Sequence, residues 1–153
     1  MPRIRVAAGW PVVAARSVAK SIAQMVCRVG IGFRYRRLAP ATGLTDFGVS
    51  HVVLKPGAWS SQRHWHDGED EFLVMLSGEA VLAEDDGQTL LRPGDCAAWP
   101  KGSTNGHHLR NESDRDCAFI VVGGGTNTGG GYSDIDMIFT DDNRYVHRDG
   151  TPY

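Results

Sequence analysis

Two histidines and a nearby carboxylate have the residue types and spacing of a metal site. His64 and His66 are two residues apart in the stretch RHWHDGEDEF, residues 63–72, and Glu71 follows an acidic run. Side chains at positions i and i+2 of a β-strand point to the same side, so both imidazoles can face one point. Two imidazoles and one carboxylate suit Fe, Mn, Ni, Zn or Cu. For the His-x-His pair taken alone, the alternative is two surface histidines on an exposed strand.

The acidic residues after His66 divide into a turn and a ligand. Residues 67–70 are predicted to form a turn, where solvated charge is the ordinary role of a carboxylate, so we do not count them as ligands. Glu71 opens the next predicted strand in phase with Leu73 and Met75. Its side chain is therefore expected to face the same interior as the two histidines.

The elements that must position these residues are short strands. From Phe47 to residue 122, apolar residues alternate with polar ones or occur in short runs between turn sequences. EDDGQTLL, residues 84–91, carries an Asp-Gly hairpin signal, and RPGD, residues 92–95, is another turn. About eight short strands at spacings of roughly ten residues predict an all-β antiparallel sandwich or small barrel.

The chain is expected to have a basic arm, a barrel and a tail. Residues 1–43 form the arm, in which residues 11–29 have the apolar spacing of an amphipathic helix. Residues 1–45 hold eight Lys or Arg and no acid, whereas the rest carries a net charge of −10, so the arm is expected to lie on the acidic domain or on a partner subunit. A flexible arm and a targeting segment are the alternatives.

The predicted barrel covers residues 44–123. The last part, residues 124–153, is predicted as a linker and a tail that docks on the barrel. The stretch GGGTNTGGG, residues 123–131, has the composition of a flexible linker, and aromatic residues in the tail favour docking.

Composition limits the partners and the compartment. No stretch approaches the roughly 20 apolar residues that span a bilayer. The acidic excess and the absence of a helix-turn-helix pattern disfavour nucleic acid as a partner. Cys27, Cys96 and Cys117 are an odd number without a Cys-x-x-Cys pair, which predicts reduced thiols and a cytoplasmic protein.

Two segments together resemble the paired motifs of the cupin superfamily. The first motif is a glycine, five residues, His-x-His, three or four residues, Glu, six residues and Gly. This chain follows it with one extra residue after the first glycine, at Gly57, His64, His66, Glu71 and Gly78. The second motif runs from a glycine through Pro-x-Gly to a His and, after three further residues, an Asn. Its matching positions here are Gly87, Pro100, Gly102 and Asn111.

The second motif leaves two candidates for its histidine. Asn105 stands where the strict pattern has His, whereas His107 has the required spacing to Asn111, which indicates a loop two residues longer. His108 is adjacent and would point the opposite way in a strand. We prefer His107, with His108 as the alternative.

The resemblance, which is strongest to small bacterial single-domain cupins, implies a jelly-roll β-barrel around one divalent metal. Zn, Ni, Mn or Fe would be held by His64, His66, Glu71 and His107. Three neutral imidazoles and one carboxylate would leave a charge of about +1 and two open positions for a bidentate anion such as a 2-oxo acid or an enediol. A homodimer is also expected.

Three functions fit these residues. The first is a metal-dependent isomerase, lyase, decarboxylase or dioxygenase on a small polar or anionic substrate, although no general acid or base beyond the ligands is obvious. The second is a non-catalytic binder, a sensor or storage protein for a small molecule or metal. In the third, the histidines only form hydrogen bonds inside the barrel. Trp59, Trp99 and Met75 are candidate walls of the pocket.

Overall fold

The computed structural model describes residues 32–153, and this part of the chain is built almost entirely of β-strands. Within these residues the one helix is α2 (Ala39–Thr42), which ends at Gly43 in the left-handed conformation. The expected all-β architecture is confirmed. The predicted helix over residues 11–29 lies outside the described residues.

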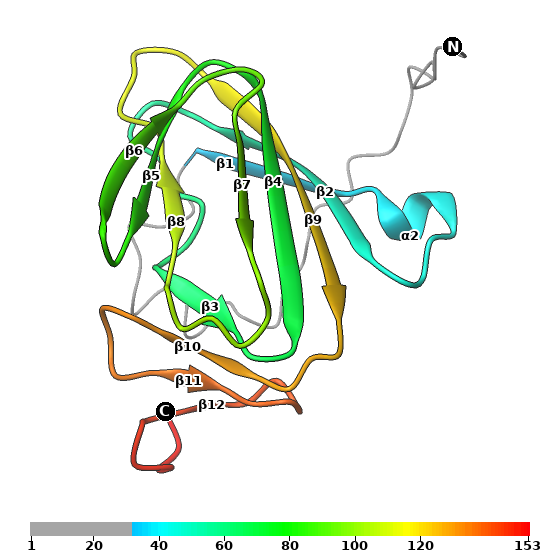
Figure 1. Cartoon of the computed structure of the whole chain (residues 1–153), viewed down its shortest axis with the longest axis vertical. Coiled ribbons are helices and arrows are strands. Elements are labelled where there is room, and N and C mark those ends of the chain that lie inside the picture. The colour runs from blue at the N-terminus through cyan, green and yellow to red at the C-terminus, as the bar shows by residue number, and fades with distance from the viewer. Residues whose placement is uncertain (1–31) are drawn as a thin grey trace.

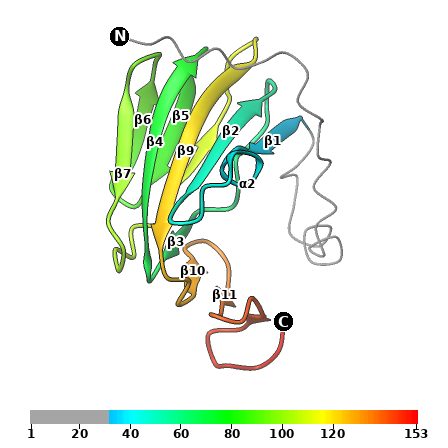
Figure 2. The same ribbon diagram turned by 90° about the vertical axis from the view of Figure 1, so that its right-hand side faces the viewer.

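A five-stranded antiparallel sheet forms the largest layer of the molecule (Figure 1). Across the sheet its strands are β1 (Phe33–Arg37), β2 (Gly48–Leu54), β9 (Cys117–Gly125), β4 (Glu69–Ser77) and β7 (Cys96–Trp99). Strands β2 and β4 both pair with β9, although 39 residues separate β9 from β4 along the chain and more separate it from β2. Figure 2 shows these strands side by side, with β5 and β6 behind them.

Two smaller antiparallel sheets complete the fold. One has the order β6 (Gly87–Leu91), β5 (Ala80–Glu84) and β8 (His108–Arg110). The other has the order β12 (Tyr145–Val146), β11 (Ile138–Phe139), β10 (Gly130–Tyr132) and β3 (His64–His66), and lies at one end of the molecule (Figure 1). Reciprocal backbone hydrogen bonds between His64 and His107 join β3 to the segment that leads into β8.

The core follows the two-residue period that the sequence predicts. In β4, Leu73 and Met75 are buried, whereas Phe72 is 43% exposed and Leu76 is also exposed. Buried residues of β2, β9 and the smaller sheets pack against Leu73 and Met75, and Phe119 and Leu54 are among the largest of them. This alternation places Glu71 on the inner side of β4, as expected.

Cys117 provides a test of this core. Its side chain is fully buried, and burial raises the pKa of the thiol to about 11, whereas Cys96 is exposed. A variant with Cys27→Ser and Cys96→Ser, whose one thiol is Cys117, is expected to resist a thiol-reactive dye at pH 8 and to react fully in denaturant. Rapid labelling of the folded variant, measured by absorbance, would contradict the buried position.

The prediction that residues 123–131 form a flexible linker is wrong at both ends of this stretch. Gly123 and Gly124 belong to β9 and pair with β4, and Gly130 and Gly131 belong to β10 and pair with β3. These glycines permit close approach of the backbone to its neighbours. A Cβ on Gly131 would lie 2.5 Å from the indole ring of Trp65, and one on Gly130 would lie 2.1 Å from the Trp65 carbonyl oxygen.

The C-terminal strands are tied to β3 by charge as well as by backbone pairing. The Arg63 guanidinium donates to both carboxylate oxygens of Asp134, at 3.0 and 2.7 Å, and to Asp85 at 2.8 Å. These two carboxylates hold the pKa of Arg63 above its ordinary value. Residues 130–146 therefore form a layer against the strand that carries His64 and His66. None of the helical structure in residues 32–153 is long and apolar enough to cross a membrane.

Candidate metal site

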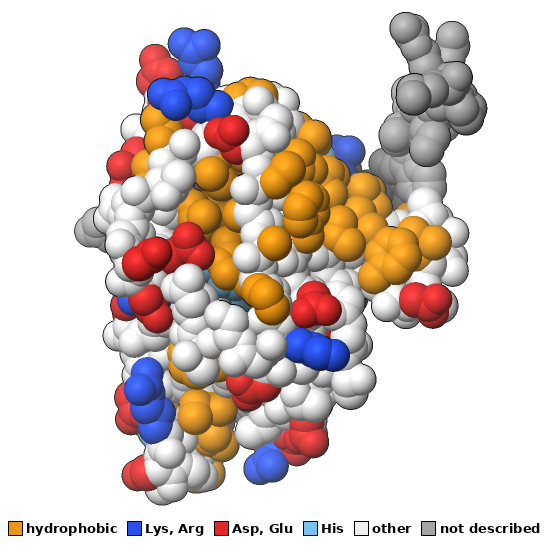
Figure 3. All heavy atoms as spheres, viewed as in Figure 1, with side chains coloured by type: hydrophobic (Ala, Val, Ile, Leu, Met, Phe, Trp, Pro, Cys, Tyr) orange, Lys and Arg blue, Asp and Glu red, His pale blue; other side chains and the backbone are white. Residues whose placement is uncertain are grey.

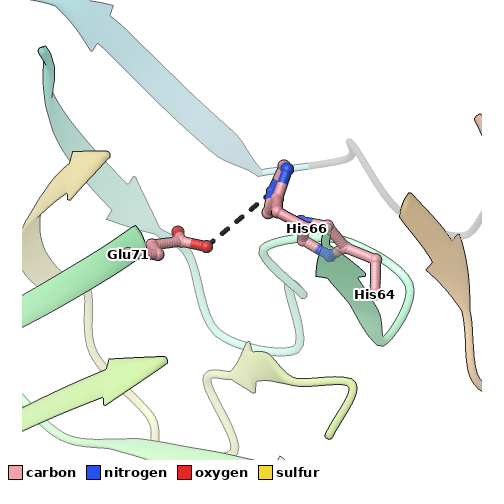
Figure 4. Close-up of side chains that lie close together, drawn as sticks. All are labelled: His64, His66 and Glu71. Atoms are coloured by element: carbon pink, nitrogen blue, oxygen red, sulfur yellow. Dashed lines mark ion pairs between the residues drawn. The ribbon is translucent and has the colours of Figure 1, made fainter. Parts of the chain in front are cut away.

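Three of the expected ligands lie together at the end of β3 and the beginning of β4. One ligand atom from each of His64, His66 and Glu71 lies within 4.8 Å of the other two. His66 Nε2 is 3.9 Å from Glu71 Oε2, the contact drawn in Figure 4. The two-residue spacing on β3 turns both imidazoles toward the carboxylate, as the sequence predicts.

His107 and His108 face opposite directions. His107 Nε2 is 3.1 Å from Glu71 Oε2, and its ring centroid is 5.4 Å from that of His64. His108 instead donates from Nδ1 to the Ser61 carbonyl at 3.0 Å and packs against Trp59. His107 is therefore the member of the pair that contacts the His64, His66 and Glu71 cluster.

The second ring nitrogens fit metal binding through Nε2. Nδ1 of His64 donates to the Gln62 carbonyl at 3.0 Å, which leaves a lone pair on Nε2, the atom available to a metal. His107 donates from Nε2 to Glu71, and its Nδ1 lies 3.4 Å from the Asn105 carbonyl, which would accept from Nδ1 when a metal takes the place of the proton on Nε2. These carbonyls are the hydrogen-bond acceptors of the ring nitrogens that would not bind the metal, and the sequence alone does not identify them.

His66 has its Nδ1 beside a carboxylate instead of a carbonyl. Its Nδ1 lies 3.1 Å from Glu69 Oε2, but the two groups are not aligned as a hydrogen bond, and this buried nitrogen has no hydrogen-bond partner among residues 32–153. A carboxylate beside Nδ1 is a common partner of a histidine that binds a metal through Nε2.

The prediction of a turn over residues 67–70 is wrong in its second half. Strand β4 begins at Glu69, and both Glu69 and Asp70 pair with β9. Asp67 accepts a hydrogen bond from Trp65 Nε1, and Asp70 accepts one from the Lys101 backbone N–H. None of these carboxylates is in the group of clustered ligand atoms. The two-residue spacing from Glu71 was the signal that could have placed Glu69 beside the histidines.

The protonation states also suit a metal. Burial lowers the pKa of His64 to about 4, so the imidazole is neutral at neutral pH. Burial alone would raise the pKa of Glu71, but the hydrogen bond from His107 and the charges of the nearby imidazoles outweigh it and hold the pKa below its ordinary value. Neutral imidazoles and an ionised carboxylate are the ligand forms that bind divalent metals.

Glu84 and Asn105 support His107, and sequence reasoning missed both. The Trp99 ring stacks on the His107 ring at 3.6 Å, with an angle of 7° between the planes. Glu84 Oε1 accepts hydrogen bonds from Trp99 Nε1 at 2.8 Å and from Asn105 Nδ2 at 3.1 Å. Asn105, at the position where the motif has a histidine, thus holds the loop that orients His107. No local pattern marks Glu84, because its partners are 15 and 21 residues away.

The ligand cluster lies in the wall of a partly open cavity of about 280 Å³. The cavity has a polar end with Ser60 and Ser61, and otherwise mainly apolar and aromatic walls. Of the three expected wall residues, Trp99 lines the cavity. Met75 is instead part of the core, and Trp59 is 37% exposed and packs against His108, so the prediction was wrong for these two.

Antiparallel sheets around a His–His–Glu cluster in the wall of a cavity are the features that the cupin motifs imply. The chain matches the cupin domain family over residues 50–123. A protein from Silicibacter pomeroyi, described as a sugar phosphate isomerase from a cupin superfamily, is 42% identical, with a TM-score of 0.76 over 80% of this chain and 81% of that one. The chain belongs to the cupin superfamily.

Other solved structures agree on the fold. A cupin 2 conserved barrel domain protein from Salinispora arenicola is 26% identical, with a TM-score of 0.52 over 60% of this chain and 74% of that one. A protein from Acidithiobacillus ferrooxidans, 21% identical, has a TM-score of 0.69 over 79% of this chain and 80% of that one, which shows the fold alone. A search of curated proteins finds no match to this chain.

Proposed function

We propose that the chain binds one divalent transition metal, Zn, Ni, Mn or Fe, through Nε2 of His64, His66 and His107 and the carboxylate of Glu71. The observation that carries this proposal is the clustering of three imidazoles around the Glu71 carboxylate in the wall of a partly open cavity. His107 completes the set because it contacts Glu71 at 3.1 Å from a strand segment paired to His64.

The preferred activity is metal-dependent isomerisation of a small hydroxy-carbonyl compound. When bound, the metal supplies Lewis-acid polarisation of substrate oxygens. The residues of the chain hold the substrate in a cavity with mainly apolar walls, where electrostatic interactions are stronger than in water. The name of the 42% identical Silicibacter protein supports an isomerase over a lyase, decarboxylase or dioxygenase.

A non-catalytic small-molecule or metal binder is the second candidate, and one observation favours it. Apart from the four proposed ligands and the indole of Trp99, the polar side chains among the described residues that line the cavity are Tyr35, Ser60 and Ser61. The lining therefore offers no free carboxylate or imidazole to move a proton. A sensor or storage protein needs the same ligands and no such group.

Two measurements test these functions. Elemental analysis of the purified wild type is expected to find about one metal per chain, and His64→Ala and His66→Ala to lose it. The metal-loaded protein is then incubated in D₂O with an α-hydroxy ketone that it binds. Deuterium incorporation, measured by NMR, supports the isomerase, whereas binding without exchange supports the non-catalytic role.

Glu84 is expected to tune metal affinity without touching the metal. Glu84→Ala leaves Trp99 Nε1 and Asn105 Nδ2 without their acceptor and loosens the support of His107. We expect metal affinity to fall by about 10-fold, the lower end of the range for residues that orient ligands. Competition with a fluorescent chelator measures the affinity. Asp86→Ala, in the turn between β5 and β6, is the control, and equal affinities for the two variants would contradict the role of Glu84.

We also propose a homodimer in the cytoplasm. The outer face of the large sheet supports the dimer, because Phe47, Phe72 and Leu76 are exposed there, and Figure 3 shows apolar side chains gathered over this face. Light scattering coupled to size-exclusion chromatography measures the mass directly, and a monomer at micromolar concentration would contradict the dimer.

A further inference from the structure

Most of the cavity wall beyond the proposed ligands and Trp99 is apolar, and the polar side chains in it are Tyr35, Ser60 and Ser61. The apolar side chains come from β1, β2, β4, β9 and the strand β8, and they are Phe33, Val52, Leu73, Leu109, Phe119 and Val121. Leu109 and Phe119 are fully buried core residues as well as wall residues. A ligand that reaches the metal must therefore place most of the rest of its surface against hydrocarbon and aromatic groups.

No lysine or arginine of residues 32–153 lines this cavity. In β1 the lining residues are Phe33 and Tyr35, so the two-residue period turns Arg34 and Arg36 to the other side. The guanidinium of Arg63 is held between Asp85 and Asp134 in the C-terminal layer.

Two further basic side chains of the barrel are also paired elsewhere. Lys55 forms an ion pair with Asp116 at 2.7 Å, and Arg110 forms one with Glu112 at 3.0 Å while its guanidinium lies over the Trp59 ring. None of these cations is placed to receive a phosphate in the cavity.

Charge balance then restricts the ligand. A divalent metal with the carboxylate of Glu71 carries a charge of about +1, which a ligand with one negative charge neutralises. A phosphate monoester brings close to two negative charges. The second charge would lie among mainly apolar groups, with no Lys or Arg of residues 32–153 in the lining to pair with it, which is costly.

On the basis of the proposed metal site, we propose that the ligand class is a small chelate with at most one negative charge and a compact apolar body. Its head carries two oxygens for the metal, as in a 2-oxo acid, and its body packs against Val52, Leu109, Phe119 and Val121. The volume of about 280 Å³ lies at the lower end of ligand pockets, so the body is short or branched. This class differs from the sugar phosphate named for the Silicibacter protein.

Calorimetric titration of the metal-loaded protein tests this class with four probes: 4-methyl-2-oxopentanoate, pyruvate, fructose 6-phosphate and inorganic phosphate. The first two compounds share the 2-oxo carboxylate group and differ in the size of the apolar body. The branched acid is expected to bind at least about 10-fold tighter than pyruvate, because it buries three more carbons. It is also expected to bind tighter than both phosphate compounds.

A matched pair of variants on β9 locates the apolar body. Val121 lines the cavity, whereas Val122 lies on the outer side of the same strand, paired with the exposed Phe72. Val121→Phe fills the cavity and is expected to weaken the branched acid about 10-fold or more while leaving pyruvate within about 3-fold. Val122→Phe is expected to change neither affinity. Thermal unfolding of both variants checks that they fold.

The outcomes separate this inference from the proposed function. Metal content is measured first in every preparation, and a wild type without metal overturns the proposed site together with the ligand class. With metal present, tighter binding of fructose 6-phosphate than of the branched acid overturns the ligand class alone. So does an equal response of Val121→Phe and Val122→Phe, or the absence of binding by the branched acid.

Discussion

Replacing Glu71 by Gln is expected to lower the affinity for a divalent metal by about 100-fold or more, beyond the range for residues that only orient ligands. Glu71 is the one carboxylate in the cluster, and the nearby imidazoles hold its pKa below the ordinary value, so it supplies the negative charge that a cation needs. Gln keeps the length of the side chain and an oxygen that can accept from His107, so the fold is expected to persist.

The measurement is competition with a chelator, with circular dichroism and thermal unfolding to confirm folding. Asp86→Asn is the matched control, because it also removes one negative charge but lies in the exposed turn between β5 and β6. It is expected to leave the affinity within about 2-fold, since exposed charges at a distance are screened. Metal binding by Glu71→Gln at the wild-type affinity would contradict the assignment of Glu71.

Replacing Asn111 by Ala is expected to lower the free energy of unfolding by about 3 kcal/mol or more. The side chain is fully buried and its amide donates to the Leu54 carbonyl at 2.9 Å and to the Arg115 carbonyl at 2.8 Å. Its oxygen accepts from the Ser113 backbone N–H at 3.0 Å and hydroxyl at 2.7 Å. Alanine removes the partner of these buried and partly buried groups, and each such group left unpaired costs about 1–3 kcal/mol when it is buried.

Equilibrium unfolding in urea measures this loss. Asp114→Ala is the control in the same loop, because its exposed carboxylate makes only a surface contact with Arg115 and is expected to contribute less than about 0.5 kcal/mol. A change below about 1 kcal/mol for Asn111→Ala would show that water replaces its hydrogen bonds. The asparagine of the second motif therefore acts through the fold, since it closes the turn between β8 and β9 and fastens it to β2.

Much of the candidate site could be predicted from the sequence, because strand periodicity is local. His64 and His66 share a side of β3, and Glu71 shares a side of β4 with Leu73 and Met75, in any structure where these segments are strands. The spacing of the two motifs then predicted the fold family, which the comparisons confirm.

The glycine-rich segment shows where composition misleads. Residues 123–131 have the composition of a flexible linker, yet they contribute to β9 and β10. The structural reason is contact with Trp65 from β3, which leaves no room for a side chain on Gly131. Some glycines are required because a distant ring packs against the backbone. The sequence alone does not distinguish them from the glycines of a flexible segment.

By itself, the sequence determined the all-β class. It also determined that His64 and His66 share one side of their strand and that Glu71 is on the inner side of the next. It narrowed the fourth candidate ligand to His107 or His108. Only the tertiary structure decided between His107 and His108, because strand parity separates their directions but does not say which side faces Glu71. The pairing of His64 with His107 shows that the side chain of His107 is the one that faces Glu71. Only the tertiary structure also showed the contacts of Glu84 and Glu69 and the mainly apolar cavity. Each depends on which strands lie opposite one another, and this arrangement is set by packing between distant segments.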